Sequence, residues 1–147
     1  MKHEMHVLGI DLAKRMFHAV GMANRGNVVY RQRLSRHDLI PCIAKLPSVL
    51  IGLEACGGAH YWARRFCASG HEVKRMAPQF VKPYVKANNN DLRDAEAIAE
   101  AMTRPPMRFV PVKSVAQQDL QALHRVRERL MKARTALINE TRGLLHA

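Results

Sequence analysis

The sequence predicts an α/β domain built on a mixed β-sheet, followed by a long carboxy-terminal helix. Apolar segments rich in valine, isoleucine and leucine alternate with segments of helical periodicity, which is typical of α/β domains. Asn24-Arg25-Gly26-Asn27 separates two of the apolar segments, and its Asn and Gly residues favour a tight antiparallel turn. A helical segment separates two later strands, and such a crossover predicts parallel pairing. The expected order is β-β-β-α-β-α-β-α, with helices on both faces of the sheet.

The first half of the chain is expected to form a three-stranded meander, then a helix and a fourth strand. Ser35 is a candidate helix cap, because its hydroxyl can accept a hydrogen bond from a free backbone N–H. Leu39 and Ile43 recur at helical spacing after it, and Pro47 ends that pattern. The expected elements are strands at residues 5–11, 17–23, 28–34 and 49–54, with a helix at residues 36–45.

The second half continues the alternation and ends in a long helix. Trp62 and Phe66 lie on one helical face, and Gly70 closes that helix. Pro78, Pro83 and Asn88-Asn89-Asn90 predict an irregular segment. The expected elements are a helix at 59–68, a strand at 71–76, an irregular segment at 77–90 with a candidate mobile loop at 83–90, a helix at 91–102, a short apolar segment at 107–112 and a helix from about 114 to the end. We therefore divide the chain into a domain at residues 1–112 and a helical part at 113–147.

The charge of the chain predicts a polyanionic partner. The sequence has 24 lysine and arginine residues against 12 aspartate and glutamate residues, a formal net charge of +12. Such an excess favours nucleic acid. The amino terminus has no apolar signal segment and no stretch approaches the length of a membrane span, so we expect a cytoplasmic protein with no membrane partner. The three cysteines are odd in number and lack a zinc-type spacing, and we expect reduced, mostly buried thiols.

Four carboxylates stand where a divalent metal site is expected. Asp11 follows the apolar Val7-Leu8-Gly9-Ile10 and Glu54 follows Val49-Leu50-Ile51-Gly52-Leu53, so each ends a strand too apolar to be exposed. Asp91 and Asp94 lie three residues apart at the start of an expected helix and share one face. A buried carboxylate is costly unless it is paired, protonated or bound to a cation. Mg²⁺ or Mn²⁺ would satisfy several acids at once, and pairs of such ions promote phosphodiester chemistry.

The order of these features resembles the ribonuclease H-like fold, in particular its RuvC-type arrangement. More closely, several blocks resemble the amino-terminal half of the bacterial insertion-sequence DEDD transposases, a family related to the Piv DNA invertase. The blocks cover nearly the whole chain, and their order is more specific than any one of them. They are Gly9-Ile10-Asp11-Leu12-Ala13-Lys14, Glu54-Ala55-Cys56-Gly57-Gly58-Ala59-His60-Tyr61-Trp62, Pro78-Gln79-Phe80-Val81-Lys82-Pro83, Asn90-Asp91-Leu92-Arg93-Asp94-Ala95-Glu96-Ala97-Ile98, Arg104-Pro105, Met107-Arg108-Phe109-Val110-Pro111 and His124-Arg125-Val126-Arg127.

The resemblance implies a DNA transposase or recombinase in which Asp11, Glu54, Asp91 and Asp94 form the catalytic metal site. It also implies Mg²⁺ or Mn²⁺ as cofactor, DNA as substrate and a bridge RNA as guide for target choice. A second domain carrying a serine nucleophile is implied as well, and we expect it to lie beyond residue 147. Six basic residues are expected to contact nucleic acid: Lys14, Lys82, Lys86, Arg125, Arg129 and Lys132.

The final helix carries a partial heptad repeat. Leu123, Leu130, Leu137 and Leu144 recur every seven residues, which could pair helices of two subunits and form a homo-oligomer. Packing against the rest of the chain is the plainer interpretation. The basic residues beside these leucines favour phosphate contacts, although charged helix faces are usually only solvated.

The sequence is also compatible with two other functions. The first is a stand-alone, metal-dependent, structure-selective nuclease such as a junction resolvase. The second is a non-catalytic nucleic-acid-binding or dimerisation module, in which Asp11 caps a turn, Glu54 accepts backbone hydrogen bonds and Asp91 and Asp94 are ordinary first-turn acids. Metal binding, and its loss in Asp11→Ala or Asp94→Ala, would separate the inert module from both enzymes.

Overall fold

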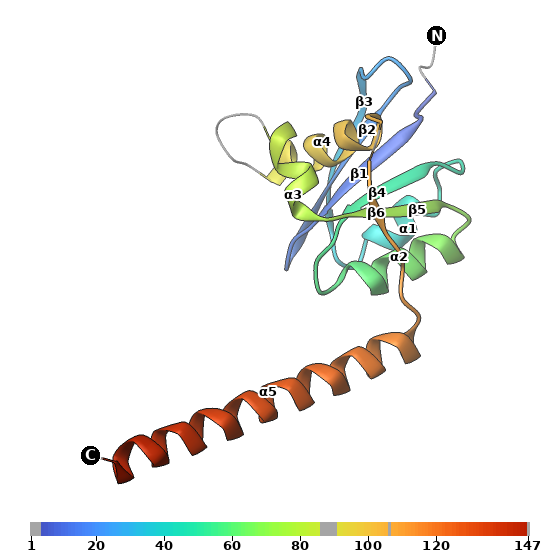
Figure 1. Cartoon of the computed structure of the whole chain (residues 1–147). Helices are drawn as coiled ribbons and strands as arrows, with labels where there is room; N and C mark the ends of the chain where they lie inside the picture. The colour runs from blue at the N-terminus through green and yellow to red at the C-terminus, as the bar shows by residue number, and fades with distance from the viewer. Residues whose placement is uncertain (1–3, 86–90, 106, 147) are drawn as a thin grey trace. The chain divides into compact units, whose positions relative to one another are not determined.

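The computed structural model of the chain describes residues 4–85, 91–105 and 107–146 (Figure 1). The chain divides into two compact units, Met1–Val112 and Lys113–Ala147. The first unit contains the sheet and its helices, and the second unit contains one long helix. Among the described residues, no helix combines the length and hydrophobicity that a membrane span requires.

The first unit is built on a six-stranded mixed sheet with strand order β3-β2-β1-β4-β5-β6. β1 pairs antiparallel with β2 and parallel with β4, β2 pairs antiparallel with β3, and β4 pairs parallel with β5. A short last strand pairs antiparallel with β5 at the edge. The strands are β1 (Val7–Leu12), β2 (Met16–Met22), β3 (Val28–Ser35), β4 (Leu50–Glu54), β5 (Glu72–Met76) and β6 (Phe109–Val110). The predicted mixed α/β sheet is therefore confirmed.

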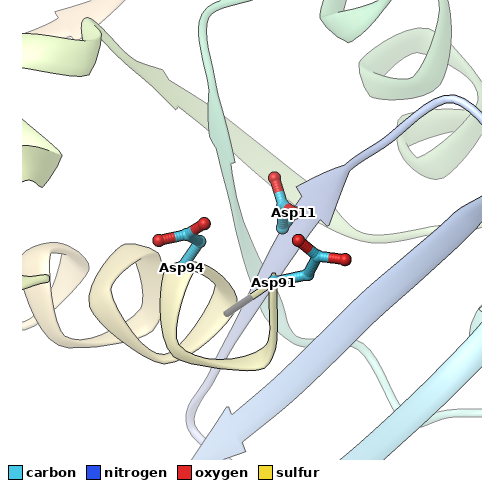
Figure 2. Close-up of side chains that lie close together, drawn as sticks. All are labelled: Asp11, Asp91 and Asp94. Carbon is cyan, nitrogen blue, oxygen red and sulfur yellow. The ribbon is translucent and has the colours of Figure 1, made fainter. Parts of the chain in front are cut away.

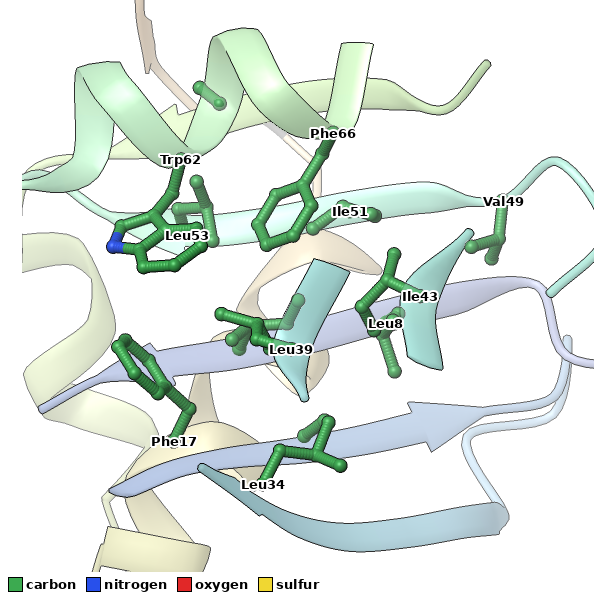
Figure 3. Packing of buried hydrophobic residues seen from close by; sticks show 13 residues of the cluster. Leu8, Phe17, Leu34, Leu39, Ile43, Val49, Ile51, Leu53, Trp62 and Phe66 are labelled. Atoms are coloured by element: carbon green, nitrogen blue, oxygen red, sulfur yellow. The ribbon is translucent and has the colours of Figure 1, made fainter. Parts of the chain in front are cut away.

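The helices cover both faces of this sheet. On one face, α1 (Leu39–Ile43) and α2 (Ala59–Ala68) bury a cluster that includes Phe17, Trp62 and Phe66 (Figure 3). On the other face, α4 (Asp91–Met102) packs on β1 and β2 and buries Val7, Met22 and Met76. Each strand alternates its side chains between the two faces, so one strand contributes to both clusters. The remaining helices are α3 (Pro78–Val81), η1 (Lys82–Tyr84) and α5 (Val115–Leu145).

Three local expectations need correction. The helix expected at 36–45 is only α1, because Ser35 still belongs to β3, where it pairs with Met16, and the helix begins after Asp38. Ser35 therefore does not cap the helix; its hydroxyl accepts a hydrogen bond from the Asp38 backbone N–H. The segment 77–90, expected to be irregular, contains α3 and η1 in its first part. Residues 86–90 of that segment lie outside the described residues.

The cysteine expectation was wrong in one respect. All three cysteines are free, as expected, but Cys56 and Cys67 are exposed and Cys42 is half-buried. Cys67 lies in the last turn of α2 on its outer side, and Cys56 lies in the loop after β4. Neither position faces one of the two hydrophobic clusters.

A buried histidine, His71, links the segment before β4 to the end of α1. His71 accepts a hydrogen bond from the Val49 backbone N–H at Nδ1, with a distance of 3.3 Å. Its Nε2 lies 3.0 Å from the Ile43 carbonyl oxygen, to which the ring donates. The neutral ring therefore satisfies one backbone donor and one backbone acceptor in the interior.

Candidate metal centre

β1 delivers Asp11 to the face of the sheet that α4 covers. Val7, Gly9 and Asp11 are two residues apart and so point to the same face. Val7 is buried in the cluster formed with α4. At Gly9 the helix lies against the strand itself, because a Cβ atom there would be 2.3 Å from the Ala95 carbonyl oxygen. This close contact leaves Asp11, the next residue on that face, beside the first turn of α4.

The first turn of α4 supplies the other two acids of the cluster. Asp91 and Asp94 lie three residues apart and share one side of the helix. Each of Asp11, Asp91 and Asp94 offers a carboxylate oxygen, and these three atoms all lie within 4.8 Å of one another. Figure 2 shows Asp11 on the strand and the two helical aspartates beside it. Residues 80 positions apart in sequence are thus brought into one acidic cluster.

Glu54 lies at the end of the neighbouring strand and outside that group of three. On β4, alternate residues point to the face that α4 covers, and these are Leu50, Gly52 and Glu54. In the parallel pair of β1 and β4, Ile10 lies opposite Leu53. Asp11 and Glu54 therefore leave adjacent strands at the same edge of the sheet. Burial raises the pKa of Glu54, the charge of Asp94 raises it further, and the Lys82 ammonium opposes both. The structure thus brings three of the four predicted acids into contact range and places the fourth next to them.

The acids of the cluster destabilise one another's ionised forms. Burial raises the pKa of Asp11 to about 6, and the charges of Asp94, Asp91 and Glu54 add to that increase. Burial also raises the pKa of Asp94, with a further contribution from Asp91. Repulsion of this kind is relieved when a cation binds between the carboxylates.

The donor set suits a hard divalent cation. Carboxylate oxygens are the ligands that Mg²⁺ and Mn²⁺ prefer, and Mg²⁺ is usually held by one or two carboxylates together with water and substrate phosphate. Three oxygens within 4.8 Å of one another can share one ion. The group consists of carboxylates alone and contains neither the cysteine nor the histidine ligands that are typical of zinc sites.

A histidine that the sequence analysis did not single out also faces this cluster. His18 is directly opposite Asp11 in the β1–β2 pair and is only 8% exposed. Its Nδ1 atom lies 3.9 Å from Oδ2 of Asp91. The hairpin register could have revealed it, because residues directly opposite in an antiparallel pair point to the same face. The sequence alone did not fix that register.

Of the predicted phosphate-binding residues in the first unit, two are exposed at or near the cluster. Lys14 lies in the turn between β1 and β2, three residues after Asp11. Lys82 is exposed in η1 and is close enough to Glu54 to oppose the rise of its pKa. Lys86 lies outside the described residues.

The predicted basic residues of the second unit are all exposed on α5. Arg125 and Arg129 face solvent, and Lys132 pairs with Glu128 at 3.3 Å on the helix surface. An exposed pair of this kind contributes little to stability. The four heptad leucines are between 64% and 74% exposed, and α5 has no buried residue.

His60 and Trp62, which belong to the block that follows Glu54, are packing residues in the structure. Trp62 lies in the hydrophobic cluster with Phe17 in an edge-to-face contact at 5.2 Å. His60 is buried, and its Nδ1 atom accepts a hydrogen bond from Arg75 at 2.9 Å. The same Arg75 nitrogen donates to the Pro111 carbonyl oxygen at 3.0 Å and so ties α2 and β5 to the end of the first unit.

Comparisons with known proteins agree with one another. The family model of the IS110-type DEDD transposases, described as a transposase, matches residues 8–147. The chain is 54% identical over 138 residues to a probable family 20 transposase of Pseudomonas aeruginosa, covering 94% of this chain and 41% of that protein. It is 49% identical over 142 residues to the transposase for insertion sequence element IS1111A of Coxiella burnetii, covering 97% of this chain and 39% of that protein. The chain thus spans about two fifths of the length of these relatives.

Among solved structures, the chain is similar to the Thermus thermophilus RuvC structure. The TM-score is 0.51 with 13% identical residues, and the match covers 71% of this chain and 99% of that one. At this level of identity the similarity concerns the fold. It confirms the predicted RuvC-type, ribonuclease H-like arrangement of the first unit.

Proposed function

The chain belongs to the IS110 family of DEDD transposases, and on that premise we propose that its first unit is a metal-dependent catalytic domain acting on DNA phosphodiesters. One observation carries the proposal. Asp11 from β1 and Asp91 and Asp94 from α4 present three carboxylate oxygens within 4.8 Å of one another. Groups that repel one another at this distance, and whose burial and charge already raise two of their pKa values, favour a bound cation.

In this proposal each residue of the cluster has a defined task. Asp11, Asp91 and Asp94 hold Mg²⁺ or Mn²⁺, and Glu54 completes the site from the adjacent strand. A cation held there would polarise the phosphate and offset the negative charge that develops on its oxygens. Lys14 and Lys82, exposed at or near the cluster, orient the DNA strand through its phosphates.

The partners follow from charge and from the family. A net charge of +12 favours binding of a polyanion whose affinity falls as salt is raised. We propose DNA as the substrate of cleavage and strand exchange of an insertion sequence, and a bridge RNA as the guide that selects the target by base pairing. Arg125, Arg129 and Lys132 on α5 add exposed positive charge that can contact either nucleic acid. A bacterial cytoplasmic location fits such substrates.

We propose further that α5 pairs with α5 of a second copy of the chain. Its heptad leucines are exposed, and a helix of 31 residues with an apolar stripe gains most of its stability by burying that stripe. Leu130→Arg together with Leu137→Arg should then convert a dimer into a monomer in light-scattering measurements. Thr135→Arg, on the exposed opposite side of the helix, should leave the mass unchanged. Equal masses for all three proteins would contradict the pairing.

The full recombination reaction needs more than the acidic cluster in this proposal. The family implies a serine nucleophile in a further domain, and the relatives are more than twice as long as this chain. We therefore expect the 147-residue chain to bind metal and nucleic acid without completing strand exchange. Strand transfer by the purified chain would contradict this division of roles.

A Mn²⁺ titration of the purified chain tests the proposed site directly. We expect binding by the wild-type chain and a loss of at least about tenfold in affinity in Asp11→Asn and Asp94→Asn, because each removes a charged ligand. Asp119→Asn, a change of an exposed acid on α5, is the matched control and should bind as the wild type does. No binding by the wild type would favour the non-catalytic module. Metal-dependent cutting of branched DNA by the chain alone would favour a nuclease that resembles a junction resolvase.

A further inference from the structure

His18 is a buried imidazole with an unused hydrogen-bonding atom at the candidate metal centre. The residue is 8% exposed, and its Nδ1 atom has no hydrogen-bond partner among the residues that the structure describes. A polar atom left without a hydrogen bond in a protein interior lowers the stability of the fold, so such an atom calls for a functional explanation. The carboxylate nearest to it is that of Asp91, with 3.9 Å between Nδ1 and Oδ2.

The fold explains why these two groups face each other. His18 is paired with Asp11 across β1 and β2, so both side chains point to the face that α4 covers. The first turn of α4 places Asp91 over that pair. The side chain of Asp91 is 67% exposed, whereas that of His18 is 11% exposed. Asp91 is therefore the freer of the two, so its carboxylate is the group that has to approach the ring for a hydrogen bond to form.

The geometry distinguishes a positioning role from that of a ligand. Within the described part of the chain, the group of possible ligand atoms that lie within 4.8 Å of one another contains Asp11, Asp91 and Asp94 but not His18. Imidazole is also a poorer ligand than carboxylate for a hard cation such as Mg²⁺. A ring behind one of the ligands, with a free nitrogen directed at it, matches the arrangement by which proteins fix a metal-binding side chain.

We propose that His18 is a positioning residue of the metal centre, whose Nδ1–H donates a hydrogen bond to the Asp91 carboxylate and holds it in the orientation that binds the cation. This rests on the proposed function, since it assumes that the three aspartates bind a divalent ion. Without the ring, the exposed Asp91 side chain would lose rotational freedom on binding the ion, and the affinity would fall. Loss of such a supporting contact typically lowers metal affinity by about 10- to 100-fold.

A matched pair of substitutions tests the hydrogen bond separately from the space that the ring fills. In His18→Asn, the amide nitrogen takes the place of Nδ1, because both are bonded to Cγ. His18→Leu branches at the same atom and has no donor. The probe is Mn²⁺ binding to the 147-residue chain, followed by the electron paramagnetic resonance signal of free Mn²⁺. We expect His18→Leu to lose affinity by about tenfold and His18→Asn to retain most of it.

A double-mutant cycle shows whether the effect passes through Asp91. In the Asp91→Ala background, His18→Leu should change Mn²⁺ affinity by less than about twofold, because the group that the ring positions is gone. A purely structural effect would instead add to that of Asp91→Ala. Melting of each chain without metal checks its folding. His18→Phe, which keeps a ring and lacks the donor, replaces the leucine variant if that one does not fold.

The outcomes separate this inference from the function on which it rests. If the wild-type chain binds Mn²⁺ and His18→Leu binds equally well, the positioning role is refuted and the metal site stands. The role is likewise refuted if His18→Asn loses as much affinity as His18→Leu, or if the two losses add in the cycle. If the wild-type chain and Asp94→Asn both fail to bind Mn²⁺, the proposed function itself is refuted and the role of His18 with it.

Discussion

Replacing Asp11 by asparagine should make the metal-free chain more stable at neutral pH, although the change removes a proposed metal ligand. The carboxylate lies beside those of Asp91 and Asp94, and the charge of Glu54 also acts on it. Burial and these charges disfavour its ionised form. Asparagine has nearly the same shape and no charge, so it removes the repulsion while leaving the packing beside α4 almost unchanged.

The magnitude follows from the pKa of Asp11, which is raised from 3.8 to about 6 in the folded chain. A carboxyl with a higher pKa when folded binds its proton more tightly when folded. Its contribution to stability is therefore complete below about pH 3.8 and is lost as the pH rises through about 6. The full pKa difference corresponds to at most about 3 kcal/mol, and we expect about 1 to 2 kcal/mol because solvent screens a partly exposed group.

Urea unfolding with EDTA present, at about pH 4 and about pH 7.5, measures this effect. The single tryptophan, Trp62, is 5% exposed and reports unfolding by fluorescence. Titrating groups away from the cluster act alike in both proteins, so the difference between wild type and Asp11→Asn reports the Asp11 carboxyl together with its repulsion of the neighbouring acids. From the lower to the higher pH, the free energy of unfolding of the variant should increase relative to that of the wild type. Added Mn²⁺ should stabilise the wild type and make it the more stable of the two proteins. A variant that is equally or less stable at both pH values would show that the acids do not repel one another as described.

Three other substitutions test the packing and the charge around the site. Gly9→Ala should lower the free energy of unfolding by about 1 to 3 kcal/mol and weaken Mn²⁺ binding, because its Cβ would collide with the backbone of α4. The control is Gly57→Ala, where a Cβ meets open space. It should change neither the free energy of unfolding nor Mn²⁺ binding. His71→Leu should cost about 1 to 3 kcal/mol in urea unfolding, since two buried backbone groups lose their partner, and an unchanged midpoint would contradict those hydrogen bonds. Lys82→Gln should weaken DNA binding at low salt and reduce the slope of log affinity against log salt by about one, whereas an unchanged slope would place Lys82 away from the phosphates.

The succession of strands and helices along the chain could be predicted from the sequence because the relevant signals are local. Apolar runs, the turn at 24–27 with its Asn and Gly residues, and the crossover helices each depend on a few neighbouring residues, and together they predict the mixed sheet that the structure contains. The short helices after β5 were missed because Pro78 reads as a helix breaker. Proline is tolerated in the first turn of a helix, and α3 begins with it. Burial of Val81 against α4, a contact distant in sequence, then favours helix over loop.

The candidate site was predictable in part for a related reason. An acid that ends a buried strand is visible in the sequence, so Asp11 and Glu54 could be singled out, and the spacing of Asp91 and Asp94 indicated a shared helical face. The distance between strand and helix is not encoded by any local pattern. Neither is the β1–β2 register that places His18 opposite Asp11, because a slip of one residue would have turned His18 to the other face of the sheet.

The two acid-bearing strands share a feature that explains how α4 reaches both. In each strand a glycine precedes the acid by two residues on the same face, Gly9 before Asp11 and Gly52 before Glu54. A Cβ on Gly9 would meet helix backbone, whereas one on Gly52 would meet the flexible side chain of Met102 at 2.6 Å. The helix therefore lies closest to β1, and its first turn approaches Asp11 more closely than it approaches the end of β4. This asymmetry accounts for a cluster that contains Asp11 with both helical aspartates while Glu54 stands beside it. The geometry of the charged site thus depends on two uncharged residues, Gly9 and Gly52, that lie beneath the helix.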